Sequence, residues 1–201
     1  MANVRQPSVA GTFYPADPAR LRDHVEKMLA EARTPGDFNA RPEPVSGTVA
    51  TAVPLALIAP HAGYRYSGPI AASAFKVLEA ASRPIHRVVV IGPSHFVPFA
   101  GVALPEAEVF ETPLGEITID VAAIDRARRI DPIVTWDEPH RHEHGIEVEL
   151  PFPQTVLGDF GLVPLVTRHT TAERVAEILD ALWNDGTLVV VSSDLFYFHD
   201  Y

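Results

Sequence analysis

Four short runs of consecutive apolar residues are spread along this chain, separated by segments in which apolar residues recur every three or four positions. An unbroken apolar run predicts a strand that is buried on both faces, whereas the spaced pattern predicts amphipathic helices. Strands that alternate with helices indicate the α/β class, with helices on both faces of a sheet. The runs predict strands over residues 55–59, 87–92, 162–167 and 187–192.

The predicted helices have recognisable starts and stops. Asp17 precedes Pro18, and this pair favours a helix start because the nitrogen of proline needs no hydrogen-bond partner at the first helical position. The interval between the first two strands predicts a βαβ unit, whose two strands should be parallel neighbours. Helices are predicted over residues 18–33, 67–82 (starting after Ser67 or Gly68), 120–130, 145–157 (broken by Pro151 and Pro153) and 172–183 (behind a capping box at residues 170–173).

Composition and charge narrow the function classes. The 201 residues fit one domain, and residues 34–54, rich in proline and glycine, are interpreted as a surface loop within it. The net charge of −10, without a cluster of Lys or Arg, argues against nucleic acid and anionic membranes as partners. The absence of cysteine from the sequence excludes disulfides and thiol chemistry within it. No signal peptide or transmembrane run is recognised, so a cytoplasmic location is expected.

Ionisable residues follow three of the predicted strands. His61 and His95 come after the first two strands, and Asp194 comes after the last. Ligands of open α/β sheets gather at the carboxyl ends of the strands, and imidazole is the commonest protein ligand for transition metals. The two histidines can therefore share one divalent ion. In the alternative interpretation, each histidine only forms hydrogen bonds within its own loop.

A second cluster, EPHRHEHGIEVELP, contains three alternating histidines. In an extended segment all three imidazoles would project to one side. In a segment that becomes helical at His144, that histidine and Glu147 would share one face. His140 and His142 are interpreted as incidental residues of a solvated loop, and His144 as a member of the pocket. The cluster does not match H-E-x-x-H, so a zincin site is not predicted.

Other chemistries receive less support from the sequence. A serine hydrolase would use Ser94 or Ser192, but the sequence contains no G-x-S-x-G motif, and no glycine-rich phosphate loop is present. Several aromatic residues follow the same strands and can either line a pocket for a planar ligand or pack in the core. These aromatic residues are Tyr64, Tyr66, Phe96, Phe196, Tyr197 and Phe198.

The motifs taken together resemble those of the Memo family, also called AmmeMemoRadiSam system protein B. They occur in the family's order: RQPSVAGTFYPADP, LIAPHAGYRYSGPIAASAF, VVVIGPSHFVPFAGVAL, ETPLGEITID, HEHGIEVELPF and VVVSSDL. The family resembles the class III extradiol dioxygenases, which are non-heme Fe(II) oxidoreductases. The resemblance implies a three-layer α/β/α sandwich around a mostly parallel mixed sheet. It also implies an Fe²⁺ cofactor, with copper as the alternative.

The resemblance assigns roles to particular residues. It implies that His61 and His95 are metal ligands and that Glu143, His144 and Asp194 line the pocket. In a catalytic version, His144 would act as acid or base, and Asp194 would orient a ligand or water. The family usually carries a histidine where this chain has Tyr197, so a proton shuttle would be lost or changed.

The resemblance also implies one domain over residues 1–201 that lacks the family's C-terminal segment, including a cysteine ligand. A third ligand would then come from His144, Asp194 or another subunit. The leading hypothesis is a metal-dependent redox protein. Its alternatives are a non-catalytic binding module for a peptide or small aromatic ligand, and an accessory protein of a radical SAM modification pathway.

Overall fold

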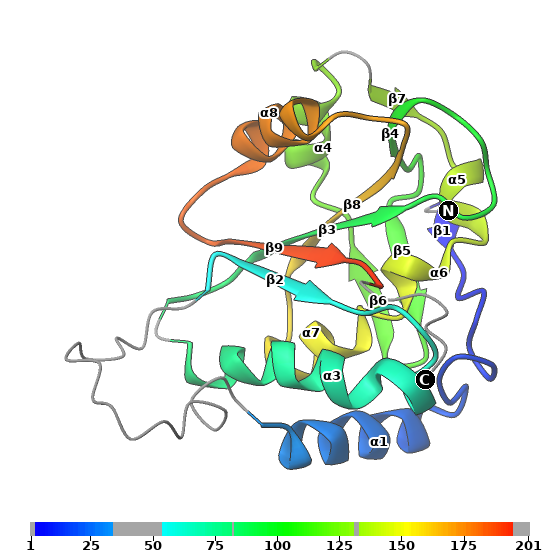
Figure 1. Cartoon of the computed structure of the whole chain (residues 1–201), viewed down its shortest axis with the longest axis vertical. Coiled ribbons are helices and arrows are strands. Elements are labelled where there is room, and N and C mark those ends of the chain that lie inside the picture. The colour runs from blue at the N-terminus through cyan, green and yellow to red at the C-terminus, as the bar shows by residue number, and fades with distance from the viewer. Residues whose placement is uncertain (1–2, 34–53, 82, 131–132, 195–201) are drawn as a thin grey trace, which may run out of the picture.

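A computed structural model describes residues 3–33, 54–81, 83–130 and 133–194 of the chain (Figure 1). The helices are α1 (Pro18–Glu31), α3 (Tyr64–Lys76), η1 (Val77–Ala80), α4 (Val121–Ala127), α5 (Glu138–Arg141), α6 (His144–Glu147), α7 (Pro151–Val156) and α8 (Ala172–Leu182). The strands are β1 (Val4–Arg5), β2 (Ala56–Ala59), β3 (Arg87–Pro93), β4 (Gly101–Leu104), β5 (Val109–Thr112), β6 (Gly115–Thr118), β7 (Ile133–Thr135), β8 (Gly161–Arg168) and β9 (Thr187–Ser192). None of the helices in the described part of the chain combines the length and the apolar composition that a membrane span requires.

A six-stranded sheet in the order β2-β9-β3-β8-β4-β7 forms the centre of the molecule. All neighbouring strands in it are parallel except β4 and β8, which pair antiparallel. Helices α1, α3 and α7 lie on one side of this sheet and α4 and α8 on the other (Figure 1). The predicted α/β class and the three-layer sandwich around a mostly parallel mixed sheet are therefore confirmed.

The four strands predicted from apolar runs are all present, but their order differs from the prediction. The prediction that β2 and β3 are neighbours is wrong, because β9 lies between them and pairs with both. The expected burial of β2 is also only half correct. Leu57 and Ala59 are buried, whereas Ile58 is 59% exposed. Because β2 is at the edge of the sheet, one of its faces stays open.

Helix α1 follows its sequence signals closely. The side chain of Asp17 accepts a hydrogen bond from the backbone N–H of Arg20, at 2.9 Å, and so caps the first turn. Pro18 occupies the first helical position as predicted. The four apolar residues of the predicted face, Leu21, Val25, Met28 and Leu29, are all buried. The face packs against α3 and α7.

The other helix boundaries depart from the prediction at particular residues. Helix α3 begins one turn early, at Tyr64, because the carbonyl of Gly63 already accepts the N–H groups of Tyr66 and Ser67. The helix predicted over residues 145–157 is divided, as expected, into α6 and α7, but Pro151 lies at the first position of α7. Helix α3 also ends early, at Lys76, and the short 3-10 helix η1 follows it. Further corrections are the N-cap of α8, which is Thr171 instead of Thr170, and the end of α4, which stops at Ala127.

A second sheet of three strands, in the order β1-β5-β6, was not predicted. Its strands are only two to four residues long and include charged residues, so they lack the unbroken apolar pattern of the main sheet. The loop predicted over residues 34–54 lies, apart from Pro54, outside the described residues.

Candidate metal centre

The carboxyl ends of three parallel strands bring the predicted site residues to one edge of the main sheet. Each site residue lies two positions after the end of a strand: His61 after β2, Asp194 after β9 and His95 after β3. These strands are adjacent in that order, and Ala59 is in register with Ser192. Equal offsets from aligned strand ends place the three side chains together, as predicted for open α/β sheets.

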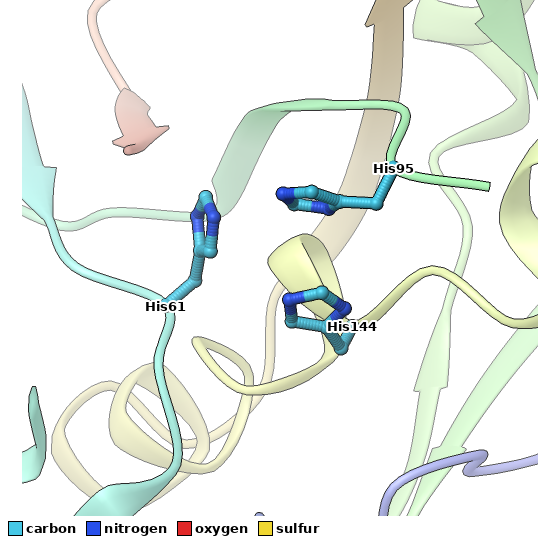
Figure 2. A group of neighbouring side chains, drawn as sticks. All are labelled: His61, His95 and His144. Atoms are coloured by element: carbon cyan, nitrogen blue, oxygen red, sulfur yellow. The ribbon is translucent and has the colours of Figure 1, made fainter. Parts of the chain in front are cut away.

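His144 joins this edge from a different part of the fold, the first residue of α6. Figure 2 shows the imidazoles of His61, His95 and His144 converging from three separate segments. One potential ligand nitrogen from each ring lies within 4.8 Å of the others. The ring centroids are 5.2 Å apart for His61 and His95, 5.6 Å for His61 and His144, and 4.5 Å for His95 and His144.

His61 is buried, with 1% of its surface exposed. Its Nδ1 lies 2.8 Å from Oγ of Ser192, whereas its Nε2 is buried and has no hydrogen-bond partner among the described residues. Burial lowers the pKa of His61 and so favours the neutral ring. Asp194 accepts the backbone N–H of His61 at 2.9 Å, and its Oδ2 lies 4.0 Å from Nε2.

Glu143 holds His95 in place. One of its carboxylate oxygens accepts the Nδ1–H of His95 at 2.8 Å, and the other accepts the backbone N–H of His95 at 2.7 Å. Burial alone would raise the pKa of Glu143, but these hydrogen bonds and one from the N–H of Gly145 lower it. The hydrogen bond between the Glu143 side chain and the His95 ring raises the pKa of His95. Because a carboxylate only accepts, Nδ1 of His95 carries the proton and Nε2 is left for a ligand.

The ring of His144 stacks on that of His95, with an interplanar angle of 23°, and packs against Phe13 with centroids 4.9 Å apart. Its Nδ1 is 3.6 Å from the Glu143 carboxylate, too far for a hydrogen bond. Burial lowers the pKa of His144, so this ring too is favoured in its neutral, ligand-competent form. Phe13 carried no signal in the sequence that linked it to the site.

These residues fit a divalent transition metal. A buried ring nitrogen without a partner would cost free energy unless an ion or another group satisfies it, and His61 Nε2 is such an atom. Three imidazoles whose ligand atoms lie within 4.8 Å form a donor set suited to iron, copper, zinc or nickel. Carboxylate support of a ligand histidine, as Glu143 gives His95, is a usual feature of metal sites.

The interpretation of His140 as a residue of a solvated loop is wrong. Its side chain is 1% exposed, and its Nε2 lies 3.0 Å from the carbonyl oxygen of Ala103 on β4. The segment folds into short helices instead of an extended strand, so the alternating histidines point in different directions. His142 is exposed, as predicted. Glu147 accepts hydrogen bonds from the N-terminal segment and takes no part in the cluster.

Ser94 and Ser192 are both buried, and the hydroxyl group of each donates its proton to a backbone carbonyl. Ser94 donates its hydroxyl proton to the carbonyl of Val97, at 2.7 Å, and so stabilises its own loop. Ser192 also contacts His61 and Glu149. Glu149 is a buried acid to which the sequence analysis assigned no role.

The aromatic residues divide between the core and the surface. Tyr64 is buried and donates its hydroxyl proton to the carbonyl of Val148, whereas Tyr66 is 76% exposed. Phe96 is 62% exposed, and its ring centroid lies 6.0 Å from that of His144. The other three aromatic residues named from the sequence, Phe196, Tyr197 and Phe198, lie outside the described part of the chain.

Comparison with known proteins agrees with the sequence motifs. The family described as Memo-like protein matches residues 5–201. A MEMO1 family protein of Methanopyrus kandleri is 36% identical over 210 residues, which cover 98% of this chain and 70% of the relative. MEMO1 family proteins of Ignicoccus hospitalis and Aeropyrum pernix are 37% and 36% identical, and each match covers 98% of this chain and 70% and 71% of the relative. The chain therefore belongs to the Memo family.

Proposed function

We propose that this chain is a metal-dependent redox protein that binds one non-heme Fe(II) ion, with copper as the alternative, through His61, His95 and His144. The observation that carries the proposal is the buried Nε2 of His61, which has no partner among the described residues and belongs to a group of three imidazoles. Neutral imidazole is a good ligand for both iron and copper.

His61, His95 and His144 would hold the iron ion, which would supply the redox chemistry of an oxygenase. The chain's own residues prepare the site for that ion. Glu143 fixes the ring of His95 through Nδ1, so that Nε2 is free. Asp194 holds the backbone of His61 through Oδ1, and its Oδ2 lies on the side of Nε2, where it can orient a water or a substrate hydroxyl.

His144 has two competing roles in this proposal. As a ligand it completes a set of three nitrogens, and the convergence of the three rings favours this role. As a general acid or base it would exchange a proton with substrate while the ion rests on the other two histidines. If His144 is a ligand, removal of its imidazole should abolish metal binding. If it is an acid or base, removal should abolish turnover and leave the metal bound.

A second candidate function is a binding module without turnover, for a peptide or a small aromatic ligand. Phe96 supports it, because a phenyl ring that is 62% exposed beside His95 and His144 offers an apolar surface next to polar groups. Oxygen uptake with candidate catechols, with and without Fe(II), separates the two functions. Fe(II)-dependent uptake supports the enzyme, and ligand binding without uptake supports the module.

The decisive experiment is metal content measured by mass spectrometry after anaerobic refilling with Fe(II). The wild type and His142→Ala, which changes an exposed histidine of the same segment, should each bind close to one ion per chain. His61→Ala/His95→Ala should lose it. Loss in His144→Ala supports the ligand role, and retention with lost turnover supports the acid–base role. A wild type without metal would contradict the proposal and leave the binding module ahead.

A further inference from the structure

The hydroxyl group of Ser192 lies behind His61, on the side of the ring away from Nε2. Ser192 is the last residue of β9 and is 2% exposed. Its Oγ contacts three polar groups: Nδ1 of His61 at 2.8 Å, Oε1 of Glu149 at 3.1 Å and the carbonyl oxygen of Gly145. A serine hydroxyl has one proton to donate and two lone pairs that accept, so three partners use its full capacity.

Glu149 differs sharply from the neighbouring buried acid Glu147, although neither is exposed to solvent. Glu147 is paired with Arg5 and accepts further hydrogen bonds from backbone and hydroxyl donors. The carboxyl group of Glu149 has Ser192 as its hydrogen-bond partner, and its Oε2 has none among the described residues. A buried carboxylate without a cation is unstable, and burial raises the pKa of Glu149 well above its usual range. Burial and the lack of a hydrogen-bond donor at Oε2 among the described residues therefore favour the neutral form of Glu149.

The hydrogen-bond capacities of these groups determine where each proton lies. The carbonyl of Gly145 can only accept, so it takes the single proton of Ser192. His61 and Glu149 must then both donate to Oγ of Ser192, the first from Nδ1–H and the second from its protonated Oε1. An ionised Glu149 would compete with Gly145 for the serine proton and would break this arrangement.

We propose that Ser192 and the neutral acid Glu149 are positioning residues that hold His61 in the tautomer with the proton on Nδ1, so that its Nε2 presents a lone pair to the candidate metal centre. The proposal rests on the proposed function only for the use of that lone pair. The role corresponds to the hydrogen-bonded partners that fix the tautomer and orientation of histidine ligands in metalloproteins. Glu143 holds the ring of His95 with an ionised carboxylate, whereas Ser192 and Glu149 hold the ring of His61 as two neutral groups.

The first test reads both protons directly in the metal-free protein by NMR. Long-range ¹H–¹⁵N correlations should show His61 with its proton on Nδ1. Carboxyl ¹³C shifts near neutral pH should show a protonated Glu149 beside an ionised Glu147, and Glu149→Gln identifies the signal by removing it. Glu149→Gln keeps a neutral donor next to Ser192 and should preserve the Nδ1–H tautomer. An ionised Glu149, or His61 protonated on Nε2, would overturn the proposal.

The second test uses Ser192→Ala, which removes the acceptor of His61 Nδ1–H while changing little volume. We expect the His61 signals to shift toward the Nε2–H tautomer and the Kd for Fe(II) to rise by about 10- to 100-fold. Ser73→Ala is the matched control, because Ser73 also donates to a backbone carbonyl, that of Pro69 within its own helix α3. Unchanged tautomer and Kd in Ser192→Ala would contradict the role of Ser192.

The two tests separate this inference from the proposed function. A wild type that shows His61 protonated on Nδ1 but binds no Fe(II) supports the positioning pair and contradicts only the metal proposal. A wild type that binds Fe(II) through His61 while Glu149 is ionised supports the metal and overturns the pair.

Discussion

His140 is buried beside the main sheet, where its Nε2 lies 3.0 Å from the carbonyl oxygen of Ala103. Burial lowers the pKa of this imidazole from 6.5 to about 4. Between these two pH values, His140 is therefore mostly protonated in the unfolded chain and mostly neutral in the folded chain. The stability that results is fully present above about pH 6.5 and is lost as the pH falls toward 4.

At pH 5 the loss at His140 amounts to about 2 kcal/mol of unfolding free energy relative to pH 7.5. His140→Gln keeps a nitrogen donor for Ala103 but cannot titrate. Urea unfolding of both proteins at the two pH values isolates the effect, because the other titrating groups are shared. The variant should lose less stability than the wild type on acidification, by about that amount. Equal losses would show that His140 does not titrate in this range.

Single residues near the site were predicted with uneven success. His61 and His95 could be located from the sequence because each follows an apolar, β-branched strand at the same offset. His140 could not, since its position in a polar, histidine-rich segment suggested solvent, and its burial comes from contacts with β4 that the segment itself does not encode. Glu149 lies among apolar residues, where an acid gives no sign of whether it is paired.

At the scale of elements, α6 connects the candidate site to the N-terminal segment. Glu147, at the end of α6, is ion-paired with Arg5 and accepts hydrogen bonds from Ser8 at 2.8 Å and from the hydroxyl of Tyr14 at 2.5 Å. Arg5 in turn donates to the carbonyl oxygen of Glu143, at 2.8 Å. The segment before α1 is therefore fixed to the same short helix that begins with a site histidine.

Glu147→Gln should destabilise the fold by about 3–5 kcal/mol, because it leaves the buried guanidinium of Arg5 without its counter-charge. The matched control is Glu138→Gln, which removes a partly exposed acid paired with Arg141 at 3.2 Å. That change should cost less than about 1 kcal/mol. Chemical denaturation measures both values. Similar losses in the two variants would contradict the structural role of the buried pair.

Elements with a strong local pattern were predicted well, and those that depend on partners were not. Helix α1 has a cap, a proline and a periodic apolar face within one segment, and it was located almost to the residue. Strands β5 and β6 are four residues long, and each contains a charged residue. They form because they pair with each other and because β5 also pairs with β1. Pairing between segments is not visible in a local pattern.

At the scale of the whole molecule, the order of the strands decided how the site is assembled. The sequence predicted that His61 and His95 lie at the tips of adjacent strands, but β9 is inserted between them. This insertion brings Ser192 and Asp194, from the end of β9, into contact with His61. Strand order depends on how the chain packs as a whole, so the position of β9 between β2 and β3 could not be derived from its own residues.

The same assembly predicts that metal binding stabilises the entire fold. The three histidines come from segments that follow β2, follow β3 and begin α6, so a bound ion joins parts of the chain that separate on unfolding. At a free Fe(II) concentration of 100 times Kd, binding to the native state alone adds about 2.7 kcal/mol. For a chain of this size, that gain raises Tm by roughly 5–10 °C.

Anaerobic thermal unfolding of the wild type and His142→Ala should show this rise, and a chelator should reverse it. His61→Ala/His95→Ala should unfold at the same temperature with and without Fe(II). Its native state then offers the ion too few ligands, so the ion does not stabilise the native state over the unfolded state. An equal rise in that double variant would mean that the ion binds elsewhere on the chain, and the candidate centre would lose its role in stability.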